Sequence, residues 1–169
     1  GRVAIAIAAN AVTDPGSVVV LDSKSLQPIA VVTVGALPDA LTFTDDGRFL
    51  LVANEGEPRC VDTTDPRAAT NPEGSVTIIE FKGKAGVKSV RTADFRAFNG
   101  RRDKLLARGV RLNWPGASVA EDLEPEYIAT DGKTAWVALQ ENNALAVIDI
   151  ATARVVDIVA LGRKDHAIE

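Results

Sequence analysis

Oxygen-bearing side chains are concentrated in a few short stretches of this chain, and they are the residue types best able to do chemistry here. The candidate metal ligands are the carboxylates Glu124, Glu126, Glu141 and Asp165. The side chains expected to bind a ligand around them are Asn54, Glu55, Glu57, Asp122, Gln140, Asn142, Arg59, Arg163 and the single histidine, His166. Carboxylate and amide oxygens are hard ligands, so the set suits calcium, magnesium or manganese. No organic cofactor is indicated, and no catalytic residue can be assigned.

Other interpretations of these residues stay open. The carboxylates could hold a cationic ligand instead of a metal, or Glu124 and Glu126 could belong to a solvated loop that enters a strand. Asn142 and Asn143 are more typical of a turn than of a ligand set. A lone histidine excludes a zinc site built from several histidines within this segment. The chain has no nucleophile elbow, Walker loop, zinc-protease motif or dinucleotide fingerprint.

An enzymatic hypothesis uses the same carboxylates. A metal-dependent phosphoesterase would hold its metal with them, place Arg59 or Arg163 on the phosphate, and let the metal activate the attacking water. A further hypothesis is a purely structural surface module whose loops bind another protein. Turnover of a phosphoester would support the phosphoesterase hypothesis. Stabilisation by a metal without turnover would indicate a binding module.

A repeated phrase organises the elements that must position these residues. Residues 16–22, 74–80 and 143–149 each consist of a turn residue, a small residue, an aliphatic-rich run and a closing carboxylate. Repetition of strand-sized units at this scale predicts a β-propeller or another β-repeat array. The closing carboxylates Asp22, Glu80 and Asp149 are expected to be structural groups at strand ends.

Hairpin signals complete the repeating unit. Asp46-Gly47 and Asp131-Gly132 each separate two apolar runs, as in a tight hairpin. The unit therefore reads as four antiparallel strands, a to d, which is one propeller blade. The predicted fold is all-β, a partial propeller of about two and three-quarter four-stranded blades, with one short helical insertion. The predicted segments are a blade part at 1–35, a blade at 36–95 with a loop insertion at 55–73, a helical insertion at 96–124, a blade at 125–162 and the start of another at 163–169.

The alternation of strand direction places the acidic residues on one face. Connections from b to c and from d to a emerge on the same side of a blade, and both long insertions and the candidate residues fall in them. Because strand a lies nearest the central axis, Glu124, Glu126, Asp165 and His166 are expected at the mouth of the channel. The sequence therefore predicts an acidic face there.

Composition excludes several functions. The 169 residues carry a formal net charge of −4 and have a pI near 5.1, which argues against nucleic-acid binding because phosphate neutralisation needs a basic face. No apolar run reaches the roughly 20 residues that span a bilayer. The single cysteine, Cys60, lies in a polar loop and is not expected to be a nucleophile. The chain lacks methionine and ends in an apparent loop, so it is expected to be a piece of something longer, with the remaining blades as its partners.

Several long motifs carry a resemblance. They include Leu-Val-Ala-Asn-Glu-Gly-Glu-Pro at 51–58, Asp-Leu-Glu-Pro-Glu-Tyr-Ile at 122–128, Leu-Gln-Glu-Asn-Asn-Ala at 139–144 and Leu-Gly-Arg-Lys-Asp-His at 161–166. Together they resemble the choice-of-anchor I family, secreted bacterial β-propeller proteins also called alkaline-phosphatase-like or mesenchyme-specific cell-surface glycoprotein-like. The chain departs from the family pattern at Ala40, where a methionine is usual, and at Arg163, where a hydrophobic or aromatic residue is usual.

The resemblance implies location and partners more than activity. It implies a seven-bladed-type propeller, an export signal upstream of this segment, and attachment to the cell surface by varied C-terminal anchors. Members often accompany or are fused to phosphatase or nucleotidase domains, so such a domain or a surface partner is expected. We therefore expect an exported module, located in the periplasm, outside the cell or on the cell surface. Its acidic face is expected to bind a divalent metal or another ligand.

Overall fold

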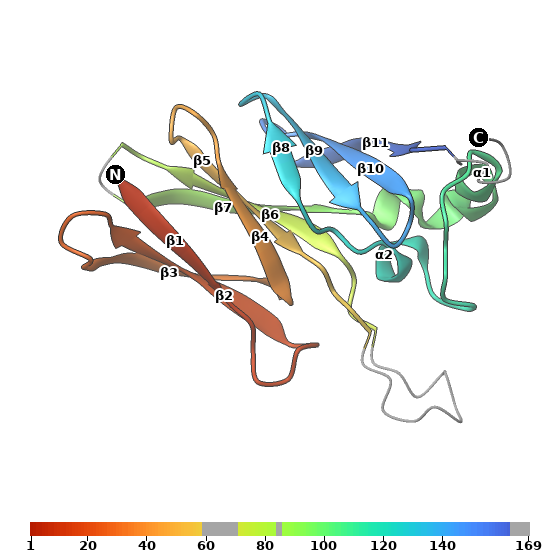
Figure 1. The fold of residues 1–169 in the computed structure, drawn as a ribbon, viewed down its shortest axis with the longest axis horizontal. Helices are drawn as coiled ribbons and strands as arrows, with labels where there is room; N and C mark the ends of the chain where they lie inside the picture. The colour runs from red at the N-terminus through yellow and green to blue at the C-terminus, as the bar shows by residue number, and fades with distance from the viewer. Residues whose placement is uncertain (59–70, 84–85, 163–169) are drawn as a thin grey trace, which may run out of the picture.

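Three antiparallel sheets follow one another along the chain in the computed structural model, which describes residues 1–58, 71–83 and 86–162 (Figure 1). The first sheet has three strands in the order β1 (Arg2–Ile7), β2 (Pro15–Asp22) and β3 (Pro28–Ala36). The second has four, in the order β4 (Pro38–Phe43), β5 (Phe49–Asn54), β6 (Ser75–Phe81) and β7 (Val87–Asp94). The third consists of β8 (Ile128–Thr130), β9 (Thr134–Leu139), β10 (Ala144–Asp149) and β11 (Arg154–Ala160).

The all-β prediction is confirmed, and the repeated phrase explains the architecture. Its three copies coincide with β2, β6 and β10. These are the c strands of the three sheets if the three strands of the first sheet are lettered b, c and d. Consecutive strands pair in every sheet, so each is a meander with its turns at the two edges. This is the organisation expected of propeller blades, while closure into a ring stays a prediction.

One hydrophobic core lies on each side of the second sheet. Val18 and Val20 of β2 pack with Leu50 and Val52 of β5 between the first and second sheets. Leu51, one position along β5, belongs to the core between the second and third sheets, because successive side chains of a strand point to opposite faces. Every residue of β5 and of β6 is buried, as expected of strands covered on both faces. Each fully buried aliphatic side chain contributes about 1.5–3 kcal/mol relative to an exposed one.

The outward faces of the first and third sheets are apolar and open. Val3, Ile5 and Ile7 of β1 are 40–46% exposed and lie on one face of that strand. Trp136 and Val159 of the third sheet are each 39% exposed. These are the faces against which the predicted further blades would pack, and that partnership stays a prediction.

A helical insertion connects the second and third sheets. It contains η2 (Arg96–Arg101), α1 (Arg102–Ala107) and α2 (Val119–Asp122). The short helix expected at 101–108 is present as α1, and Gly109 follows it with a φ of +96°, a conformation that suits glycine after a helix. Within the described residues, none of the helices has the length and apolarity needed to cross a membrane.

Candidate functional site

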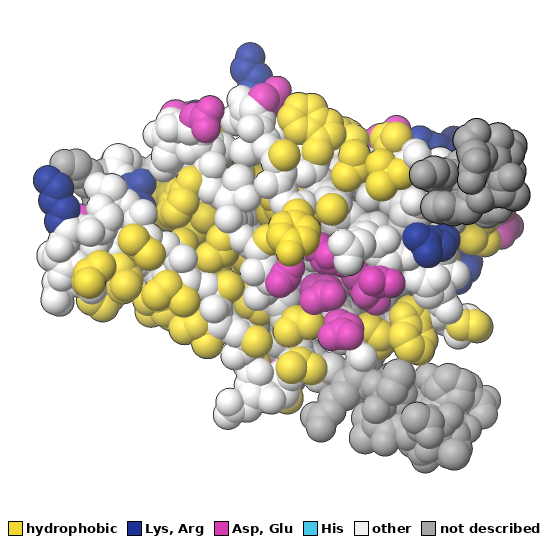
Figure 2. Space-filling model, in the orientation of Figure 1, with side chains coloured by type: hydrophobic (Ala, Val, Ile, Leu, Met, Phe, Trp, Pro, Cys, Tyr) yellow, Lys and Arg dark blue, Asp and Glu magenta, His cyan; other side chains and the backbone are white. Residues whose placement is uncertain are grey.

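Acidic residues from the second and third sheets meet at one edge of the structure. Glu55 follows the end of β5, Asp39 lies at the start of β4, and Glu126 stands just before β8. Because β4 and β8 begin at the edge where β5 and β9 end, the side chains of both sheets come together there. We call Asp39, Glu55, Glu57, Glu124, Glu126 and Glu141 the acidic edge. Figure 2 shows Asp and Glu side chains gathered on this face, near α2, with hydrophobic side chains around them.

Glu124 and Glu126 are the most buried carboxylates of the acidic edge. They are 6% and 8% exposed, respectively. Burial raises the pKa of Glu124 to about 7, repulsion from Glu141 and Glu57 adds to the rise, and a hydrogen bond from Trp114 partly offsets it. The pKa of Glu126 is also raised, first by burial and then by the nearby Asp39 and Glu141. No described residue forms an ion pair with either carboxylate.

Glu55 shares this environment from the second sheet. Its pKa is raised to about 7, mainly by burial and further by the negative charges of Glu57, Asp39, Glu124 and Glu126. Five carboxylates proposed from sequence are thus connected by charge repulsion. Glu55 is repelled by Glu57, Glu124 and Glu126, and Glu141 repels both Glu124 and Glu126. The edge concentrates negative charge that the described residues do not neutralise.

The shifted carboxyls predict a pH-dependent stability. Glu55 and Glu124 have folded-state pKa values of about 7 against 4.5 without burial, so the native state retains protons that the unfolded state has lost between these values. The free energy of unfolding should therefore fall as pH rises from 4.5 to 7, by about 1 kcal/mol for each group after allowance for solvent screening. Glu124→Gln should flatten this fall, leaving the variant more stable than the parent at pH 8 in the presence of chelator. Urea denaturation at pH 4.5 and pH 8 tests this, and parallel profiles for the two proteins would contradict it.

Asp39 and Trp114 belong to the site but are absent from the set proposed from sequence. Asp39 occupies the same place in its repeat as Glu126, since Pro38-Asp39 and Pro125-Glu126 both precede the apolar residues of strand a. That correspondence was the available signal. Trp114 offered none, because its contact with Glu124 depends on the path of the insertion.

Asn142 is engaged within the protein. It is fully buried, and its Nδ2 donates to the carbonyl oxygens of Asp122 at 2.7 Å and Arg111 at 3.0 Å. Its Oδ1 accepts the backbone N–H of Glu124 at 3.1 Å. The amide therefore ties the backbone at Asp122 and Glu124 to that of Arg111 in the insertion, which gives Asn142 a positioning role.

Asp122 has a similar role. Its Oδ1 accepts the backbone N–H of Asn113 at 2.6 Å, and its Oδ2 accepts the N–H of Trp114 at 3.1 Å and a guanidinium N–H of Arg102 at 3.3 Å. The residue is 1% exposed. A carboxylate with these donors is stabilised without a metal. Asp122 thus folds the insertion back so that Trp114 reaches Glu124.

The remaining predicted ligands divide into three groups. Asn54 is fully buried, next to Gly35 of the first sheet, and its Nδ2 donates to Ser75 Oγ at 3.2 Å and Thr77 Oγ1 at 2.9 Å, so it faces the core rather than the acidic edge. Gln140 is exposed in the turn after β9. Four predicted site residues lie outside the described part of the chain: Arg59, Arg163, Asp165 and His166.

The closing carboxylates of the repeat are structural, as predicted. Asp22 accepts the backbone N–H groups of Lys24 and Ser25, each at 2.9 Å, and Asp149 accepts that of Thr152 at 2.7 Å. Glu80 is held differently. Hydrogen bonds from Arg48, Lys88 and Ser89 lower its pKa to about 2.

Among residues 1–58, 71–83 and 86–162, no three acidic, histidine or cysteine side chains converge closely enough to hold a metal ion in their present positions. The carboxylates of the acidic edge repel one another, but their oxygen atoms do not converge on a common metal position. Binding a metal would therefore require side-chain rotation. This is compatible with the location of Glu55, Glu57 and Glu141 in connections rather than within strands.

Comparisons with known proteins agree with the architecture. Hydrazine synthase of Kuenenia stuttgartiensis superimposes with a TM-score of 0.54 at 16% sequence identity, covering 88% of this chain and 37% of that chain. At this identity the likeness shows the fold alone, and this chain spans little more than a third of that structure's length. A search of the curated proteins finds no match. The family model of the choice-of-anchor I domain matches residues 1–169, so the chain belongs to the choice-of-anchor I family.

Proposed function

We propose that this domain is an exported or cell-surface module whose acidic edge binds a divalent cation. The observation that carries the proposal is the pair Glu124 and Glu126. Both carboxylates are more than nine-tenths buried, face further carboxylates, and have no cationic partner among the described residues. Buried charges are normally paired, protonated or bound to metal. Above pH 7 protonation no longer compensates, and a cation becomes the natural partner.

The donor set favours a hard cation. The six residues of the acidic edge offer carboxylate oxygens, and oxygen ligands of this kind suit calcium, magnesium or manganese. Glu124, Glu126 and Glu141 would supply ligands from the third sheet, while Glu55 and Glu57 would border the site from the second. Asp165 and His166 complete the set proposed from sequence and lie outside the described residues.

Elemental analysis of protein purified without chelator, followed by thermal denaturation, tests the cation site. Stoichiometric calcium, magnesium or manganese is expected, and adding the ion to chelated protein at 100 times its Kd should stabilise the fold by about 2.7 kcal/mol. Glu126→Gln should abolish this stabilisation. Asp103→Asn removes an exposed carboxylate from α1 and should leave the response intact, which controls for loss of net charge. Equal responses in the parent and both variants would reject the assignment.

The phosphoesterase hypothesis requires an additional result. Its proposed phosphate ligands, Arg59 and Arg163, lie outside the described residues, so no observation on the site favours catalysis over binding. Turnover of a chromogenic phosphoester that disappears with chelator and with Glu126→Gln would establish it. Cation-dependent stabilisation without turnover would assign a binding module, and the absence of both would leave a structural interaction module.

The proposed location rests on the family. Membership of the choice-of-anchor I family supports an exported or cell-surface protein. Protease treatment of intact cells producing the full-length protein should degrade an outward-facing domain while sparing a cytoplasmic marker. Complete protection in intact cells and after release of the periplasm would contradict export.

A further inference from the structure

A gap of about 450 Å³ separates the second and third sheets at the edge opposite the acidic edge. Both of its walls are four-stranded sheets, and its lining comes from the β4–β5 and β8–β9 turns, the ends of β6 and β10, and β7. The charged groups that line it are three cations and two carboxylates, namely Arg48, Arg91, Lys133, Glu80 and Asp149.

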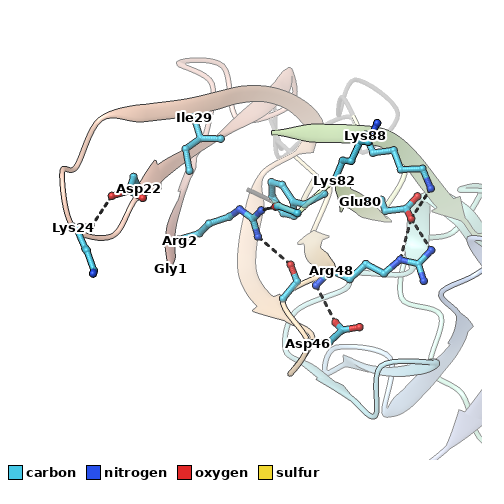
Figure 3. Close-up of a pocket in the computed structure, with 13 residues that line it drawn as sticks. Gly1, Arg2, Asp22, Lys24, Ile29, Asp46, Arg48, Glu80, Lys82 and Lys88 are labelled. Atoms are coloured by element: carbon cyan, nitrogen blue, oxygen red, sulfur yellow. Dashed lines mark hydrogen bonds and ion pairs between the residues drawn. The ribbon is translucent and has the colours of Figure 1, made fainter. Parts of the chain in front are cut away.

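Arg48 is held rigidly at the wall formed by the second sheet. Its Nε and Nη2 donate to Oε1 of Glu80 at 3.0 and 2.7 Å, and Figure 3 shows the head groups of Arg48 and Lys88 meeting at this carboxylate. The guanidinium carbon lies 4.9 Å from the ring centre of Phe49, which belongs to the core between the second and third sheets. Nη1 of Arg48 has no hydrogen-bond partner among the described residues, so a fixed guanidinium keeps an open donor edge.

Arg91 crosses the gap from β7 to the third sheet. Its guanidinium donates to the carbonyl oxygens of Ala151 and Ile150, the latter at 3.1 Å. Both partners are neutral, and no carboxylate of the described residues forms an ion pair with Arg91. Arg91 therefore joins the two walls and leaves its positive charge in the gap.

Lys133 supplies the cation of the third sheet. It lies in the turn between β8 and β9, where Asp131 accepts the backbone N–H groups of Lys133 and Thr134 at 2.9 and 2.7 Å. The side chain is exposed, and within the described part of the chain its ammonium group has neither an ion-pair nor a hydrogen-bond partner. The turn thus fixes the backbone of Lys133 while the ammonium stays available to a ligand.

The two carboxylates of the gap are already engaged. Besides the Arg48 guanidinium, Glu80 accepts the Lys88 ammonium at 2.9 Å. Asp149 accepts the backbone N–H and the hydroxyl of Thr152, both at 2.7 Å. These hydrogen bonds lower the pKa of Glu80 to about 2 and also lower the pKa of Asp149. With Lys88 included, four cations surround two carboxylates in a chain whose net charge is −4.

From this arrangement we infer that the gap between the second and third sheets is a second binding site, for a small oxyanion of the phosphate type. The oxyanion accepts charge-assisted hydrogen bonds from Nη1 of Arg48 on one wall and from the ammonium of Lys133 on the other. Arg91 and Lys88 add positive potential without leaving their present partners. The bound anion joins the turns of the two sheets at the edge opposite the proposed cation site.

Inorganic phosphate is the probe. It is titrated calorimetrically into protein that has been freed of metal with chelator and then dialysed, so that no cation at the acidic edge can recruit it. We expect saturable binding of one equivalent that weakens with added sodium chloride. Glycerol phosphate, titrated in parallel, distinguishes the two sources of the group: comparable affinity indicates the phosphoryl group of a larger molecule, and much weaker binding indicates free phosphate.

Lys133→Gln should weaken phosphate binding about tenfold, and Lys133→Arg should restore it. Lys104→Gln removes the same charge from an exposed position in α1, outside the gap, and should bind phosphate like the parent. Absence of binding to the parent, unchanged binding by Lys133→Gln, or equal weakening by Lys133→Gln and Lys104→Gln would overturn the inference.

Glu80→Gln gives a prediction of opposite sign. It frees Arg48 and Lys88 from their shared carboxylate, so affinity for phosphate should rise roughly threefold or more. Weaker binding by a folded Glu80→Gln protein would also count against the site. Because Lys133 is exposed, its substitutions decide the matter if Glu80→Gln does not fold.

Discussion

Replacement of Asn142 by alanine is expected to lower the free energy of unfolding by about 3 kcal/mol, because two buried backbone groups and one partly buried one lose their partner together. The amide connects the carbonyl oxygens of Arg111 and Asp122 to the backbone N–H of Glu124. Alanine leaves these groups inside the protein with no partner, and the space vacated by the amide is available to at most a few waters. The expected measurement is a lower urea midpoint at pH 5, below the raised pKa values of Glu55 and Glu124.

The same substitution should affect cation binding beyond its cost in stability. Without the amide, the backbone of Glu124 is free to move relative to Glu141, which lies beside Asn142 in the turn after β9. The stabilisation by a divalent cation should therefore shrink in the folded variant. Gln140→Ala removes an exposed amide from the same turn and should change stability by less than about 0.5 kcal/mol. Similar losses in both variants would show that Asn142 has no special positioning role.

The fold was largely predictable because its signals are local. The repeated phrase at 16–22, 74–80 and 143–149 determines which strand of each sheet it forms, and the Asp-Gly pairs mark the hairpins between strands a and b. Alternation of strand direction then assigns each connection to an edge. The spacing of Ser118 and Glu121 is a local signal of the same kind, since it forms the capping box of α2, in which the two residues exchange hydrogen bonds with each other's backbone.

The site was predictable in position but not in the role of each residue. Sequence correctly grouped Glu55, Glu57, Glu124 and Glu126 at one edge, because the topology alone brings their loops together. The sequence does not distinguish a carboxylate that is directed into the site from one that accepts hydrogen bonds from the backbone. Asp122 and Glu124 are two residues apart and chemically alike, yet backbone N–H groups from the insertion satisfy the first and not the second. That difference arises from long-range packing, which no local pattern encodes.

The packing in question depends on a close approach at Gly74. This residue lies just before β6, and its N–H donates to the carbonyl oxygen of Ala120 at 3.0 Å. Its α-carbon faces the backbone between the helical insertion and β8, so an added methyl group would overlap the carbonyl oxygen of Leu123 and lie 2.7 Å from Pro125 Cδ. Glycine is therefore required here for contact between two backbones rather than for an unusual φ angle.

Gly74→Ala should consequently cost about 3 kcal/mol of stability, since neither backbone can yield without disturbing a sheet or the insertion. Because Leu123 and Pro125 flank Glu124, separating them from the second sheet should also move Glu124 and Glu126 away from Glu55 and Glu57. We therefore expect the cation response and the fall of stability between pH 4.5 and 7 to weaken together in this variant. Gly100→Ala is the matched control, because a methyl group there meets open space. If Gly74→Ala loses stability but keeps both responses, the two sheets reach the acidic edge independently, and convergence of their carboxylates does not depend on this contact.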